Sequence, residues 1–218
     1  MKKSLLALLF LIGFGCLCYA ADESQEPPLI YTLEIDGQQH ELLLDKPITI
    51  TGAHNNPEVK LRASSTRQFT YGNVAFQYPA SFTWEAEIVD ENSKSWVLSG
   101  NDFKMMYFIL PYEITVDDYA QSLANQFGEK KIRISETERT LGSQKLKGRL
   151  LFVRIAGVTL NLEVYEFQSN KGTRLLVLQD SPPDNSAISK EGETALHLLS
   201  TSFEDTTTSE KQDAGQGD

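Results

Sequence analysis

The sequence predicts an α+β fold, in which an antiparallel β-sheet is flanked by two main helices and preceded by an N-terminal β-hairpin extension. Along most of the chain apolar residues recur at every second position, which is the period of a half-buried strand. Only two stretches, at about 116–127 and 186–200, have apolar residues at the helical spacing of three and four. The 218 residues suffice for one well-buried domain with extensions.

The first twenty residues have the composition of a signal peptide. Lys2 and Lys3 precede a long uncharged apolar run, and Ala20 is a small residue that suits a signal peptidase cut. We therefore expect residues 1–20 to be removed and the protein to be exported, periplasmic or extracellular, with no transmembrane segment in the mature chain. A membrane-anchored lipoprotein, modified at Cys16 or Cys18, is the alternative, because each cysteine has part of the lipoprotein pattern around it. Cleavage would remove both cysteines, and with them any disulfide or cysteine-ligated metal site.

The residues after the leader divide into an acidic lead-in and a block of short strands. Residues 21–28 are polar and contain two prolines, and we expect them to be disordered. Asp36-Gly37 separates two apolar runs at 30–35 and 40–44, which predicts a hairpin because this dipeptide tolerates positive φ. With two further short strands, residues 29–64 form either a small β appendage or an extension of the main sheet.

Residues 65–205 contain the main domain. Alternating apolar and polar residues predict its strands, at 68–71, 74–78, 82–88, 96–98, 103–110, 131–140, 144–155, 158–168 and 173–179. Thr115 is the predicted N-cap of the first helix, and Gly128 ends that helix. The second helix precedes a tail, residues 206–218, which has no apolar residue but Ala214 and should be disordered.

A basic stretch between residues 130 and 154 contains one hairpin whose register the sequence predicts. Strands 131–140 and 144–155 meet at Gly142-Ser143, so that Glu136 lies opposite Arg149 and Glu138 opposite Lys147. The charges of this stretch then form cross-strand pairs on a solvated face. The alternative is a basic face that docks on an acidic partner.

The order of these elements over residues 67–204 resembles a known family. The shared features are the strand Phe76–Pro79 with aromatic residues soon after it, the helix that begins at Thr115, the run of long strands, and the closing helix that ends in Thr201-Ser202-Phe203. Together they resemble the PsbP-like fold, which has the bacterial DcrB-type envelope proteins as relatives. The resemblance implies an α/β/α sandwich and a non-enzymatic binding or assembly factor, and it assigns no functional residue.

Charge and motifs argue against several chemistries. The net charge of −10 becomes two units more negative once Lys2 and Lys3 leave, so nucleic acid is an unfavourable partner. His40-Glu41 begins like a zinc-protease helix, but Leu44 stands where the second histidine is required. The sequence contains neither a Gly-x-Ser-x-Gly elbow nor a phosphate-binding glycine loop. We therefore expect no catalytic residue, no metal and no cofactor.

Aromatic residues concentrate between positions 69 and 112, and core packing is the first explanation for them. The second is a ligand-binding groove, for which Tyr71, Tyr78, Trp96 and Tyr112 are the candidates because their polar tips tolerate partial exposure. Three functions follow from the sequence. The first is a binding or assembly module of the bacterial cell envelope that acts through contacts with a protein partner. The others are a carrier of a small apolar or aromatic ligand and a hydrolase with an unrecognised site.

Overall fold

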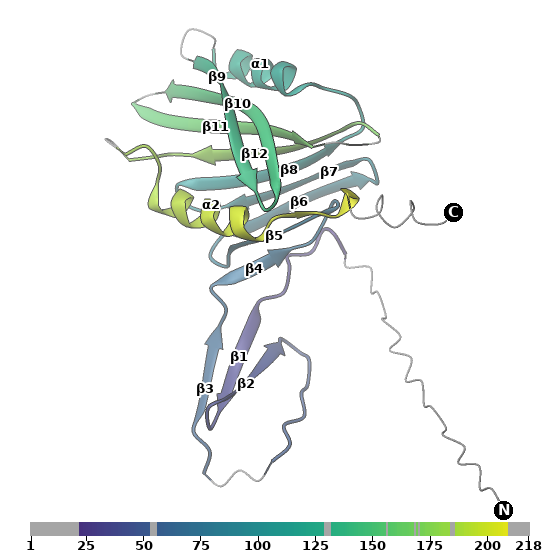
Figure 1. Ribbon diagram of the computed structural model, residues 1–218, viewed down its shortest axis with the longest axis vertical. Coiled ribbons are helices and arrows are strands. Elements are labelled where there is room, and N and C mark those ends of the chain that lie inside the picture. Colours follow the sequence, from purple (N-terminus) through teal and green to yellow (C-terminus); the bar gives the residue numbers. More distant parts are fainter. Residues whose placement is uncertain are drawn as a thin grey trace, which may run out of the picture.

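The computed structural model describes residues 22–52, 56–128, 132–155, 157–167, 169, 171–183 and 186–208. Within them, the chain forms thirteen strands in three antiparallel sheets, together with two α-helices (Figure 1). The predicted signal peptide, both cysteines, and residues 209–218 of the predicted tail lie outside the described residues. Of that tail, Thr206–Thr208 form a 3₁₀ turn.

The largest sheet has seven strands in the order β6-β7-β8-β12-β11-β10-β9. Their bounds are β6 Thr83–Asp90, β7 Ser93–Ser99, β8 Phe103–Leu110, β9 Ile132–Leu141, β10 Gln144–Ile155, β11 Val158–Phe167 and β12 Thr173–Asp180. Consecutive strands pair as hairpins except at β8, where the helix α1 (Val116–Phe127) and β9–β11 intervene before β12 returns to pair with β8. This return places β12 in the middle of the sheet.

β12 is buried on both of its faces, and this creates two cores. Leu176 and Leu178 belong to an aromatic-rich core on one face of the sheet. That face is covered by β5 (Val74–Pro79), which pairs with β4 (Thr66–Phe69) and β13 (Glu204–Asp205), and by α2 (Lys190–Ser202). Leu175 and Val177 belong to an aliphatic core on the other face, where α1 packs against β9, β10 and β11.

The predicted α+β sandwich is therefore wrong: the fold is mostly β. The helix α2 shares its face of the main sheet with a second sheet, in which β4 and β5 form a hairpin through the Gly72-Asn73 turn. Both turn residues have positive φ, at 60° and 64°, which closes this hairpin tightly. Alternation identified these strands, but it carries no information on which sheet a strand joins.

Residues 30–63 form a third sheet, in the order β2-β1-β3, which we call the β arm. Its strands are β1 Ile30–Ile35, β2 Gln38–Leu43 and β3 Val59–Ala63, and Asp36 and Gly37 make the predicted positive-φ turn between the first two. The arm extends away from the seven-stranded sheet (Figure 1). Of the two alternatives that the sequence left open, the structure shows a separate small sheet.

The predicted register of the β9–β10 hairpin is confirmed. Glu136 pairs with Arg149 and Glu138 with Lys147, and an oxygen of Glu136 lies 3.7 Å from a guanidinium nitrogen of Arg149. Arg149 also forms an ion pair with Asp117 of α1, so it ties that helix to the sheet. Lys130 and Lys131, which the sequence included in the basic stretch, lie outside the described residues.

Both helices begin at a capping side chain. The hydroxyl of Thr115 accepts a hydrogen bond from the backbone N–H of Asp118, as predicted. The second helix begins at Lys190 and not near 186, because Ser189 is its N-cap. Ser189 is buried and donates its hydroxyl to Asp180 at the end of β12, so the tertiary contact fixes where the helix starts.

Gly142, in the β9–β10 turn, gives the first testable prediction. Its φ is +54°, and a Cβ at this position would lie 2.1 Å from the carbonyl oxygen of Phe203 at the end of α2. We expect Gly142→Ala to lower the free energy of unfolding by about 3 kcal/mol, since strain and a backbone clash act together. Gly157→Ala is the control, because its φ is +87° but a Cβ would meet nothing within 4 Å.

In Gly157→Ala the free energy of unfolding should fall only by the cost of a positive φ at an alanine, about 1 kcal/mol. Urea unfolding of the two variants measures both values. Equal losses would show that α2 does not pack against this turn.

Candidate functional site

The structure places the four residues proposed for a ligand groove in two different environments. Tyr71, Tyr78 and Trp96 are core residues, with 6%, 0% and 0% of their surface exposed. Burial raises the pKa of Tyr78 far above its usual range, and the hydroxyl of Tyr78 has no hydrogen-bond partner within the described residues. Tyr112 is 57% exposed and lies between β8 and α1, outside this core. The four residues therefore do not line one groove.

Two of the four residues do come together, and a third aromatic residue joins them. Tyr71 stacks on Trp96 with ring centroids 6.1 Å apart, and Trp84 lies 5.6 Å from Tyr71 in a tilted arrangement. Trp84 is on β6 and Trp96 on β7, at positions whose partners place both rings on the same face of the sheet. We call Tyr71, Trp84 and Trp96 the aromatic platform.

The polar tips of the platform bind the start of the chain. Trp96 Nε1 donates a hydrogen bond to the carbonyl oxygen of Glu23 at 2.8 Å, and Trp84 Nε1 donates to that of Ser24 at 3.1 Å. The hydroxyl of Tyr71 donates to the carbonyl oxygen of Gln25 at 3.0 Å. Three successive peptide carbonyls are thus each met by a different side chain, and the lead-in, residues 22–28, is held on the main domain where disorder was predicted.

Two basic side chains complete this contact. Lys94 of β7 forms an ion pair with Glu23, and Arg67 of β4 forms one with Glu26 at 3.3 Å. Arg67 also donates a hydrogen bond to the carbonyl oxygen of Pro27, which is buried. Burial raises the pKa of Tyr71, and the nearby carboxylates of Asp22 and Glu23 raise it further, so its hydroxyl stays a donor at neutral pH. The arrangement holds the chain's own acidic segment, which turns between Asp22 and Gln25.

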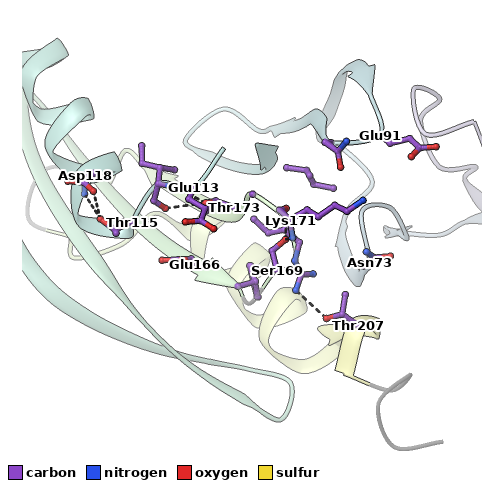
Figure 2. A pocket seen from close by; sticks show the side chains of 16 residues that line it. Asn73, Glu91, Glu113, Thr115, Asp118, Glu166, Ser169, Lys171, Thr173 and Thr207 are labelled. Carbon is purple, nitrogen blue, oxygen red and sulfur yellow. Dashed lines mark hydrogen bonds between the residues drawn. The ribbon is translucent and has the colours of Figure 1, made fainter. Parts of the chain in front are cut away.

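Apart from the aromatic platform, the surface has a polar groove of about 900 Å³, which lies between β12, the start of α1 and the turn after β13 (Figure 2). Arg174, at its base, is 3% exposed and pairs with Asp205 at 3.0 Å. The guanidinium also lies over the ring of Phe167, with 5.6 Å to the ring centroid. Because this cation is already paired, its first role is to fasten β13 to the main sheet.

The titratable side chains on the groove wall are exposed. Glu113, Asp118, Glu166 and Lys171 all lie at the surface, and Asp118 receives a hydrogen bond from Thr115 as part of the helix start (Figure 2). Within the described residues, no group of three or more histidine, cysteine or carboxylate side chains lies close enough together to hold a metal ion. The groove therefore offers polar and charged side chains that reach solvent.

Neither a protein-family model nor a curated protein matches this chain. The similarity to the PsbP-like fold therefore rests on the residues quoted above and stays a resemblance. Of the described helices, none is long and apolar enough to cross a membrane.

The buried Arg174–Asp205 pair gives the second prediction. Burial alone would raise the pKa of Asp205, but hydrogen bonds from Arg174 and Thr207 outweigh it and lower that pKa below its ordinary value. A carboxyl whose folded pKa is depressed stabilises the fold above its unfolded pKa, and this contribution is lost as the pH falls through the folded pKa. Asp205→Asn should therefore lower the free energy of unfolding at pH 7 by about 3 kcal/mol, because it leaves a buried cation without its counter-ion.

Urea unfolding at pH 7 and pH 3 tests this. Between pH 7 and pH 3 the free energy of unfolding should fall less for Asp205→Asn than for the natural chain. Asp117→Asn is the matched control, since Asp117 pairs with Arg149 at the surface and should cost less than about 1 kcal/mol. A similar loss in both variants would contradict the structural role of the buried pair.

Proposed function

We propose that the protein is an exported, non-catalytic binding or assembly module of the bacterial cell envelope that acts through protein–protein contacts. The observation that carries this proposal is the edge of the β arm's apolar face, where Val59 and Leu61 on β3 are exposed although Ile35 on β1 is buried. The signal-peptide composition of residues 1–20 supports the assignment to the envelope.

The register of the β arm separates its side chains into two faces. Leu33 pairs with Leu61 and Ile35 with Val59, and paired residues of an antiparallel sheet point to the same side. The residues between them, including Lys60 and Arg62, point to the other side. The arm therefore has one apolar and one charged face.

The apolar face reaches solvent at strand β3. Val59 is 55% and Leu61 60% exposed, and within the described residues the three strands of the arm make their extensive contacts with one another. A small sheet with an apolar face normally packs this face against another layer. A contiguous exposed apolar surface on a projecting element is typical of a protein-binding site.

The same strand also supports contact through its backbone. β3 is an edge strand, so its outward N–H and C=O groups can pair with a strand of another protein. Lys60 already pairs with Glu58 at 2.7 Å, so Arg62 is the cation that would favour an acidic residue on the partner strand, beside apolar residues that meet Val59 and Leu61. The proposed partner is therefore an envelope protein with an apolar surface and an accessible acidic strand.

Site-specific photo-crosslinking in intact cells tests this function. A photoreactive residue at position 61 should give a discrete adduct with one envelope protein, whereas the same residue at position 41, which is exposed on the charged face at the opposite edge of the arm, should give at least several-fold less. Val59→Asp should abolish the adduct at 61, because a charge on the apolar face must be desolvated on binding. Equal adducts at 61 and 41 would show that neither the apolar face nor the β3 edge selects the partner.

A further inference from the structure

We propose that the aromatic platform, with Lys94 and Arg67, is a second protein-binding site that recognises an acidic peptide segment of a partner. The segment has two acidic residues three positions apart and a proline after the second. In the structure this site is filled by the chain's own lead-in. The site is separate from the β arm, so either proposal can fail without the other.

The backbone contacts show that the site reads a peptide. Carbonyl groups of Glu23, Ser24 and Gln25 each receive a hydrogen bond from a platform side chain, at 2.8, 3.1 and 3.0 Å. These groups are common to every peptide, so this part of the contact does not depend on sequence. Indole and phenol donors on a rigid aromatic surface are well suited to such contacts, because little side-chain entropy is lost on binding.

The side-chain contacts give the site its preference. Lys94 pairs with Glu23 and Arg67 with Glu26, and these two acids stand three residues apart. The side chains of Lys94 and Arg67 are only 14% and 17% exposed, so their pairs are less screened than ordinary surface pairs. Arg67 also donates to the carbonyl oxygen of Pro27, whose ring is buried. An acidic segment with a following proline matches all of these contacts.

The lead-in is held in a way that allows exchange. Its own backbone–backbone hydrogen bond, from Gln25 N–H to the Asp22 carbonyl, is internal to the segment. Asp22, Ser24 and Gln25 are exposed, so the segment is anchored mainly at the half-buried Glu23 and the buried Pro27. Its attachment to the chain gives it a high effective concentration, and a partner segment must compete with this.

The experiment uses the full chain with Glu23→Lys and Glu26→Lys, which places lysines opposite Lys94 and Arg67 and should release the lead-in. The chain has two tryptophans, and both belong to the platform, so intrinsic fluorescence reports directly on its occupancy. We expect the emission of the variant to move to the red. Glu34→Lys with Glu41→Lys, on the β arm, makes the same change of charge away from the platform and should leave the emission unchanged.

A synthetic peptide with the sequence of residues 21–28 is then added to the first variant. We expect it to restore the original emission with a Kd of about 1 mM or below, and a peptide with lysine at both glutamate positions to bind at least about tenfold more weakly. An unshifted emission in the variant, no binding of the acidic peptide, or equal binding of both peptides would overturn the proposal. Dimers of the natural chain formed by exchanged lead-ins would make a second copy the occupant, and would overturn the assignment to a foreign partner.

Discussion

The burial of β12 on both faces is the constraint on which the main domain depends. Leu175 and Val177 point to one side, and Leu176 and Leu178 to the other, so the strand is stable only if both faces of the sheet are covered. The helix α1 packs against one face, while β5 and α2 together cover the other. The return of the chain from β11 to pair β12 with β8 brings these layers together in one domain.

The β arm departs from this pattern. Its apolar face is only partly covered, because Ile35 on β1 is buried whereas Val59 and Leu61 on the edge strand β3 are exposed. The aromatic platform departs from it in another way, because it is covered by a segment that contributes peptide carbonyls and acidic side chains in place of apolar ones. Both surfaces are suited to contacts with other proteins, as the proposed binding module requires.

Local patterns predicted the elements and one of the registers. The Gly142-Ser143 turn and the charges on either side of it fix the β9–β10 pairing, because hairpin register depends on residues close in sequence. Thr115 predicted the start of α1 for the same reason. The burial of β12 on both faces could not be predicted in the same way, because a continuous apolar run such as Leu175–Leu178 does not show which elements cover each face.

What the sequence could not show depends on contacts between distant residues. The fold class was wrong because alternation does not reveal that β4, β5 and β13 form a sheet of their own. The lead-in was predicted to be disordered because it is polar and contains two prolines, but hydrogen bonds to its backbone carbonyls, which leave no sequence pattern, hold it on the domain. Tyr71 and Trp96 were proposed for a ligand groove because their polar tips tolerate partial exposure, but both residues are buried and those tips meet the chain's own peptide groups.

The main domain covers its own core, whereas the β arm leaves Val59 and Leu61 exposed to solvent. Amide hydrogen exchange of the isolated full-length chain measures this most directly, because protection follows the burial and cooperativity of each element. The amides of β12 should exchange only through global unfolding, and those of β3 should exchange at least about a hundredfold faster. Equal protection of β3 and β12 would mean that the arm is already covered, and would contradict the account.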